Sequence, residues 1–177
     1  MLKRVKLNMD LIEAMLYYWQ ATNDREKVSE KYLNDVADMA GLTLIYDEEF
    51  NEESVRKVLS AITNREPFSA ANKKEGRFWN NNMWMMEDLG YTDLMVQPLK
   101  KLNIDTVLEK LQNTPLGEKY EELEVIISPM HLDEYKIVDN KLIINFFRVK
   151  PSDIDDNIFV DGKEIKEYIE EKLKELL

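Results

Sequence analysis

Cysteine is absent from the 177-residue sequence, and histidine occurs once, as His131. Without cysteine the chain has no disulfide, no thiol nucleophile and no cysteine-ligated metal site. Zinc and non-haem iron sites generally use two or more histidine or cysteine ligands, so the sequence disfavours both. A Ser-His-Asp triad would have to use His131, and there is no G-x-S-x-G motif to supply its serine. We therefore interpret His131 as a structural or solvent-facing residue.

Glycine is also scarce, with only five in the chain and no two of them close together. A P-loop or a G-x-G-x-x-G turn needs several glycines within a few residues, because backbone amides must approach a phosphate closely. Neither turn can be built from this sequence. We expect no bound cofactor.

Long apolar runs are missing as well. The longest cover only a few residues, such as "LIINFF" at 142–147, whereas a membrane-spanning helix needs about 20 apolar residues. The N-terminal "MLKRVKLNMD" is basic but lacks the apolar stretch of a signal peptide. These observations predict a soluble protein that resides in the cytoplasm and does not enter a membrane.

Acidic residues outnumber basic ones by 35 to 24, which gives a formal net charge of −11. Non-specific binding to nucleic acid depends on clustered lysine and arginine, so direct contact with nucleic acid is not expected. An acidic surface would instead favour encounter with a basic protein. The alternative is that the charge serves only to maintain solubility.

The spacing of apolar residues predicts an α+β fold with its helices first. Residues 1–115 have the pattern of a mainly helical lobe. Residues 116–177 have the pattern of a small antiparallel sheet of about three strands, followed by a C-terminal helix that packs on it. We expect both parts to form one compact domain. With their caps, the expected helices of the first part span 10–22, 24–40, 51–66, 78–89 and 104–113.

Two connecting segments of the first part are predicted from composition. The run "LTLIY" at 42–46 resembles a short strand, and the polar segment 69–76 is expected to be a mobile loop. Gly90 is the expected stop of the helix over 78–89.

The second part is rich in β-branched and aromatic residues at 123–128, 131–138 and 141–149. The last two segments are joined by "DN", a favourable hairpin turn. Because 141–149 is apolar on both faces, we expect it to be a central strand covered on both sides. In the final helix one apolar stripe is predicted, formed by Ile165, Ile169, Leu173 and Leu177.

One stretch, "GRFWNNNMWMMEDLGY" at 76–91, combines many core residues with three consecutive asparagines. On a helix, most of its methionine and aromatic residues share one side, which we interpret as core. Asn82 falls in the middle of that apolar side, so we expect it to be buried and hydrogen-bonded. Trp84 falls in the middle of the opposite, polar side.

The position of Trp84 suggests the leading functional hypothesis. An exposed tryptophan beside Asn80, Asn81, Glu87 and Asp88 has the composition of an interface anchor with a polar rim. We therefore expect a non-catalytic protein that acts by binding another, possibly basic, protein, in the manner of an immunity protein, an inhibitor or a regulator. In composition the chain is similar to immunity proteins, which neutralise basic toxin domains.

Three alternatives remain open. Trp84 could be covered by the segment 69–76 or by the C-terminal part, which would bury the helix all round. It could also form a self-interface, which would make the protein a structural subunit of a homo-oligomer. The third alternative is a magnesium-dependent hydrolase of nucleotides or phosphate esters, with Glu30, Asp38 and Glu49 as oxygen ligands.

Overall fold

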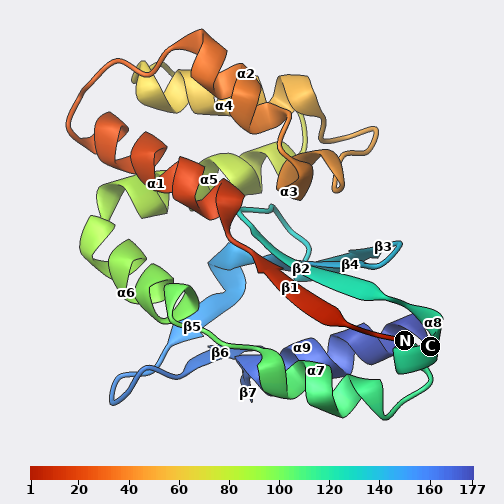
Figure 1. The fold of residues 1–177 in the computed structure, drawn as a ribbon. Helices are drawn as coiled ribbons and strands as arrows, with labels where there is room; N and C mark the ends of the chain where they lie inside the picture. The colour runs from red at the N-terminus through yellow and green to blue at the C-terminus, as the bar shows by residue number, and fades with distance from the viewer.

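The computed structural model describes residues 1–177 and confirms the α+β class, with nine α-helices and two small sheets (Figure 1). The helices are α1 (Asp10–Asn23), α2 (Glu30–Ala37), α3 (Ala40–Thr43), α4 (Glu52–Thr63), α5 (Lys73–Glu87), α6 (Leu89–Lys100), α7 (Asp105–Gln112), α8 (Leu116–Lys119) and α9 (Ile165–Leu173). The strands are β1 (Arg4–Asn8), β2 (Glu122–Ser128), β3 (Tyr135–Val138), β4 (Lys141–Asn145), β5 (Val149–Pro151), β6 (Ile158–Val160) and β7 (Lys163–Glu164).

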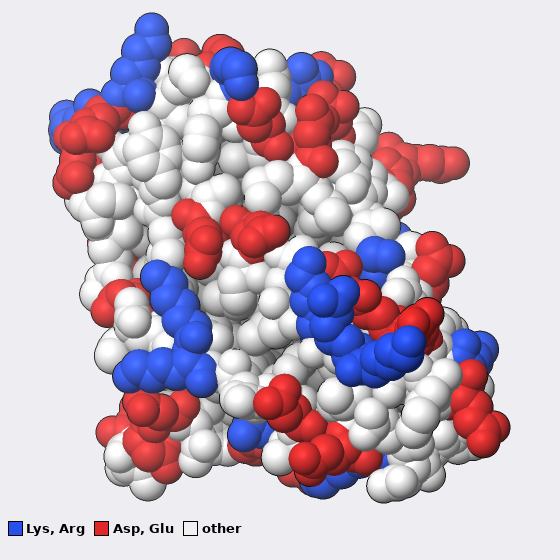
Figure 2. All heavy atoms as spheres, viewed as in Figure 1, with Lys and Arg blue, Asp and Glu red and all other residues white.

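The larger sheet has the strand order β1-β2-β4-β3 and is mixed. Strand β1 runs parallel to β2, β2 runs parallel to β4, and only β3 is antiparallel to its neighbour. The N-terminal strand was not predicted from the sequence. Its basic side chains lie against carboxylates of β2, as in the pair Arg4–Glu122 at 2.6 Å, and Figure 2 shows this basic group interleaved with acidic side chains over β1. Its pairing partner is more than 100 residues away, so periodicity within a five-residue segment could not reveal it.

Strand β4 is central in this sheet, between β2 and β3. Its side chains Leu142, Ile143 and Ile144 are all fully buried, as expected for a strand covered on both faces. The predicted hairpin is confirmed, because β3 and β4 pair antiparallel across a turn at Asp139 and Asn140. Asp139 adopts a left-handed conformation with φ of 54°, which aspartate tolerates better than most residues.

The predicted strand over 141–149 is interrupted after Asn145. The buried Asn145 side chain accepts a hydrogen bond from the Phe147 amide at 3.0 Å. It also donates to the carbonyl groups of His131 and Asp133, at 3.1 and 2.9 Å. These bonds fix a 3₁₀ turn at 146–148, and the chain then leaves the larger sheet to form β5.

The smaller sheet, β5-β6-β7, is antiparallel and leads into α9. The stripe predicted for the last helix is confirmed for Ile165, Ile169 and Leu173, which are fully buried. It is wrong for Leu177, which is 61% exposed. The helix tightens to a 3₁₀ turn at 174–176, so the rotation per residue changes and the last leucine leaves the stripe.

The helices form layers around the larger sheet (Figure 1). Helices α1 and α3 lie on one side of β2, and α7 and α9 lie on the opposite side, where α7 contacts β1. Helix α4 packs on both α2 and α5, and these two helices also contact α1. One continuous apolar cluster of 45 buried residues runs from Leu2 to Leu173.

The segment 42–46 is helical and turn-like, so the prediction of a β-like run there is wrong. Residues 40–43 form α3, whose buried Leu42 faces the core, and Ile45 follows in the next turn. The amides of Leu42 and Leu44 donate to carbonyl groups three or four residues earlier. Local hydrogen bonds therefore satisfy the backbone where no strand is available for pairing.

His131 is a buried residue three positions after the end of β2, with an exposed fraction of 2%. Its Nδ1 accepts a hydrogen bond from the Leu132 amide at 2.8 Å, whereas Nε2 has no partner. Its ring packs edge-on against Phe50, with the ring centroids 4.7 Å apart. Because Nδ1 is an acceptor here, the neutral imidazole carries its proton on Nε2.

Burial of His131 lowers its pKa in the folded protein; nearby Asp133 opposes this effect and Lys74 adds to it. In the unfolded chain the neutral imidazole takes up a second proton at about pH 6.5. The neutral imidazole therefore stabilises the folded state above that pH. Its contribution is lost as the pH falls from about 6.5 through the lower folded pKa.

We expect the free energy of unfolding, measured by urea denaturation, to decline from pH 7.5 to 5.5, and to decline less steeply in His131→Gln. Equal slopes in both proteins would contradict this assignment. Unperturbed carboxylates titrate near pH 4, below this interval.

Candidate functional site

The site is built at the corner between α5 and α6. Asp88 ends α5 and caps α6, because its carboxylate accepts a hydrogen bond from the Tyr91 amide at 3.0 Å. The Thr92 hydroxyl bridges the corner and lies 3.0 Å from the carbonyl oxygens of both Met85 and Asp88.

Gly90 lies inside α6, so its prediction as the helix stop is wrong. Aspartate is among the best N-caps, and here a new helix begins directly after the old one.

Asn82 is fully buried and both polar atoms of its side chain are hydrogen-bonded, as predicted. Its Oδ1 accepts a hydrogen bond from the indole Nε1 of Trp19 at 3.0 Å, and its Nδ2 donates to the Phe78 carbonyl at 2.9 Å. Trp19 belongs to α1 and is also fully buried. This polar pair therefore joins α5 to α1 inside the core and fixes which face of α5 points outward.

Trp84 lies on that outward face and is 63% exposed. The alternative that 69–76 covers it is wrong, and so is the prediction of a loop over the whole of that segment. Helix α5 already begins at Lys73, because the Asn72 side chain caps it by accepting the Glu75 amide at 3.0 Å. Phe68, just before the segment 69–76, stacks on Trp79 with the ring centroids 6.3 Å apart.

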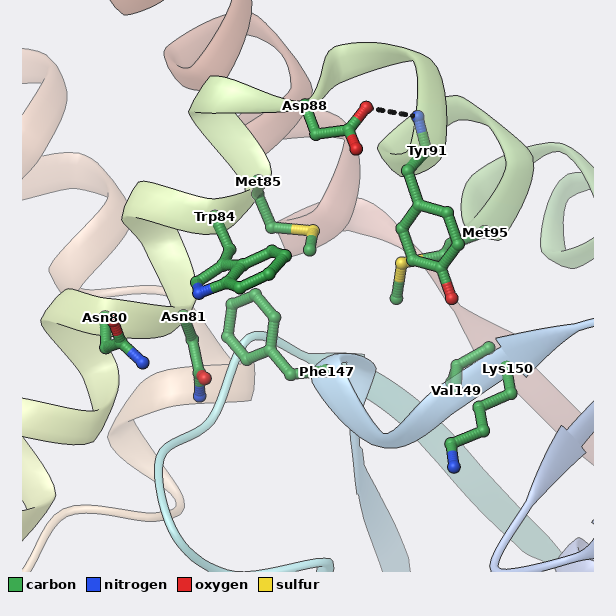
Figure 3. Close-up of a pocket in the computed structure, with 10 residues that line it drawn as sticks. All are labelled: Asn80, Asn81, Trp84, Met85, Asp88, Tyr91, Met95, Phe147, Val149 and Lys150. Atoms are coloured by element: carbon green, nitrogen blue, oxygen red, sulfur yellow. Dashed lines mark hydrogen bonds between the residues drawn. The ribbon is translucent and has the colours of Figure 1, made fainter.

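The C-terminal part does not cover Trp84 either, but it forms the opposite wall of a hollow of about 370 Å³ (Figure 3). In Figure 3 the Trp84 indole and the Tyr91 ring lie on opposite sides, with the Met85 thioether between them. The walls come from α5, α6, the 3₁₀ turn after β4 and strand β5. The lining residues are Asn80, Asn81, Trp84, Met85, Asp88, Tyr91, Met95, Phe147, Val149 and Lys150.

Four of the five predicted interface residues line this hollow, namely Trp84, Asn80, Asn81 and Asp88. The fifth, Glu87, is exposed but does not line the hollow.

The other lining residues were not predicted. Tyr91 was missed because α6, the helix that begins directly after α5, was not recognised from the sequence. Phe147 and Val149 were assigned to an uninterrupted central strand, and Lys150 follows them. The only sequence signal that could have revealed this wall is Asn145, a polar residue between two apolar runs.

Core contacts hold Phe147 at the hollow. The Asn145 side chain fixes its backbone amide, as described above. The Trp19 ring lies 6.4 Å from the Phe147 ring and stacks on Phe146 at 5.8 Å. Trp19 therefore touches both walls, since it binds Asn82 on the α5 side. Contacts within the buried core therefore hold both walls of the hollow in place.

The proposed magnesium ligands lie at separate places. Glu30 is the first residue of α2, where its carboxylate accepts a hydrogen bond from the Ser60 hydroxyl. Asp38 caps the other end of the same helix, about 12 Å away at the helical rise per residue. Glu49 is an exposed residue of the segment before α4. No group of three or more histidine, aspartate or glutamate side chains is placed to hold a metal ion.

The hollow combines apolar walls with a few polar groups. Its walls are aromatic and thioether groups, and its polar groups are two amides, one carboxylate, one phenol and one ammonium. Concave sites of about 300–1,000 Å³ with apolar walls and a few polar groups are typical of ligand recognition. None of the helices combines the length and apolar character that a membrane-spanning segment requires.

Comparison of the chain with models of protein families, with curated proteins and with solved structures gives no match in any of the three.

Proposed function

We propose that this protein is a non-catalytic binding protein, of the immunity, inhibitor or regulator type, that engages another protein through the hollow beside Trp84. The observation that carries the proposal is the exposed indole of Trp84 at the edge of an apolar hollow, with amides and a carboxylate around it. Tryptophan is the residue most enriched among the anchors of protein interfaces. Polar groups around such an anchor are typical of the interface rim.

The energetics favour burial of Trp84 by a partner. A tryptophan side chain can bury about 150–250 Å², and most of it is exposed here. Removal of about 100–150 Å² of this apolar surface from water would contribute about 3 kcal/mol at 25 cal/mol per Å². The two outward asparagines lower the helix propensity of α5 by about 0.5 kcal/mol each relative to alanine. A recognition role for these residues offsets that cost.

Affinity capture from a lysate of the source cells tests this assignment with wild type and Trp84→Ala. We expect a captured protein whose apparent affinity falls at least tenfold in the variant, because anchor residues typically contribute about 2 kcal/mol or more. Tyr17→Ala is the matched control, since it removes an aromatic side chain of α1 that is 50% exposed and does not line the hollow. Trp84→Ala should retain the wild-type free energy of unfolding within about 0.5 kcal/mol, whereas Tyr17→Ala should lose about 0.5–1.5 kcal/mol because it also removes the edge contact between the Tyr17 and Tyr32 rings.

Two results would contradict the proposal. Retention of the same partners by Trp84→Ala would remove Trp84 from the interface, and capture of no partner by wild type would leave the hollow without a protein ligand. Light scattering separates a third case: a multimeric mass that falls to the monomer mass in Trp84→Ala would assign the hollow to self-association.

A further inference from the structure

A second hollow, of about 310 Å³, adjoins the first along the groove between α6 and β5. Tyr91 lines both hollows. Along β5, Val149 and Lys150 line the first hollow, and Pro151 lines the second. Figure 1 shows α6 beside β5. The binding surface therefore continues beyond Trp84, down α6 and onto the connection between β5 and β6.

The continuation also exposes large apolar side chains. Leu94 of α6 is 60% exposed and lines the second hollow, and Tyr91 is 43% exposed between the two. Ile154, in the β5–β6 connection, is 91% exposed. These three residues and Trp84 are four of the seven large apolar side chains that the protein exposes. Trp84, Tyr91 and Leu94 line the groove, and Ile154 lies in the connection beside it. Exposed apolar surface gathered in this way is typical of an interaction site.

The charge of the groove identifies the kind of partner. Its lining contains five carboxylates and only one ammonium group, that of Lys150; the carboxylates belong to Asp88, Asp93, Asp153, Asp155 and Asp156. Lys101 lies 3.8 Å from Asp156 and neutralises part of this charge. In Figure 2 acidic side chains gather at the lower left, where the β5–β6 connection lies in Figure 1.

A second copy of this chain would meet the groove with the same charges. In a two-fold symmetric contact each patch faces its own copy, and facing carboxylates repel. A basic segment would instead pair with these carboxylates while its apolar side chains cover the exposed rings. Aromatic rings also attract cations placed over their faces.

The extent of the second hollow along α6 sets the length of the peptide segment that fits it. Tyr91, which lines both hollows, and Pro98, which lines the second, are seven residues apart on α6, or about 10 Å. An extended chain advances about 3.3 Å per residue. An extended segment therefore covers this distance in about three residues.

We propose that the occupant is an extended segment of a basic partner protein. It places one large apolar or aromatic side chain in the hollow beside Trp84 and a lysine or arginine about three residues away in the second hollow, near Asp93 and Asp153. This inference rests on the proposed function, and names the chemistry of the partner and the residues of α6 and the β5–β6 connection that select it.

A displayed library of random twelve-residue peptides, selected on the immobilised full-length protein, tests the inference. We expect enriched peptides to combine a large apolar residue with a lysine or arginine about three positions away. A synthetic peptide of the enriched sequence should bind at least tenfold more weakly to the double variant Asp93→Lys/Asp153→Lys and should weaken as salt is raised. Glu26→Lys/Glu66→Lys is the matched control, because it changes the net charge equally at exposed positions that line neither hollow.

The outcomes separate the inference from the proposed function. Peptides that depend on Trp84 but lack basic residues, or that bind the Asp93/Asp153 variant as well as wild type, would overturn the inference and leave the proposed function standing. The same conclusion follows if no peptide is enriched while a lysate partner still depends on Trp84. Equal weakening in the control variant would assign the effect to net charge and overturn the inference. Loss of Trp84 dependence in both experiments would overturn both.

Discussion

Replacement of Asn82 by alanine is expected to lower the free energy of unfolding by about 2–4 kcal/mol. The variant leaves the indole N–H of Trp19 without an acceptor in the core, which costs about 1–3 kcal/mol, and it removes packed side-chain atoms as well. Both partners are fully buried, so water cannot replace the lost hydrogen bond at the surface. Urea denaturation followed by circular dichroism measures the change.

Asn80→Ala is the matched control for that experiment. It makes the same substitution two residues earlier on α5, at an exposed position. Alanine is a better helix former than asparagine by about 0.5 kcal/mol, so we expect the control to keep or slightly raise the stability. A similar small effect in both variants would mean that the Trp19–Asn82 bond does not hold α5 in place.

The same bond connects stability to the hollow. Trp19 contacts Phe147, which lines the hollow from the C-terminal side. Loosening of α5 in Asn82→Ala should therefore weaken partner binding, even at temperatures where most of the protein remains folded.

Gly117→Ala is expected to destabilise the protein by about 3 kcal/mol. A Cβ atom at this position would clash with the backbone of Gln112, approaching its carbonyl carbon to 2.9 Å, and backbone atoms cannot move aside as the end of a side chain can. Overpacking of this kind typically costs about 1–3 kcal/mol, and occasionally more.

The damage from Gly117→Ala should extend to the N-terminal strand. The Gly117 carbonyl accepts a hydrogen bond from the Leu2 amide at 2.6 Å, and the Gln112 side chain donates to the Leu2 carbonyl at 2.9 Å. Both contacts lie where the chain enters β1. We expect amide hydrogen exchange in β1 to accelerate more than in β4.

Gly90→Ala provides the contrast. Gly90 lies in the first turn of α6, and the nearest atom to an added Cβ is Asp88 Oδ1 at 3.8 Å, an ordinary contact. Replacement of a helical glycine by alanine stabilises a protein by about 0.4–1 kcal/mol. Opposite signs at these two glycines, in thermal or urea denaturation, would confirm that the close approach at Gly117 controls the first effect. A loss of stability in both variants would contradict it.

The sequence predicted those features that are encoded within one segment. Helices α1, α4, α5 and α7 follow from apolar spacing and from caps such as Asn51, and the β3–β4 hairpin follows from its Asp-Asn turn. The buried state of Asn82 and the outward direction of Trp84 follow from the same helical periodicity. In each case the physical cause, a backbone repeat or a local hydrogen bond, acts over a few residues.

Contacts between segments far apart in the sequence could not be predicted from local patterns. Strand β1 exists because Val5 meets Leu123 across the parallel register, and nothing within residues 4–8 requires that partner. The two walls of the hollow likewise come from segments about 60 residues apart, at Trp84 and Phe147.

By itself, then, the sequence determined the α+β class, the acidic character of the surface, and the one helix on which a tryptophan stands among polar residues. The tertiary structure alone decided that this tryptophan is uncovered and that Phe147, Val149 and Tyr91 join it around a hollow. The reason is that a side chain's direction is a local property of its helix, whereas its exposure depends on whatever other segments pack above it. Here the buried contacts of Trp19 and Asn145 place those segments beside Trp84 rather than over it.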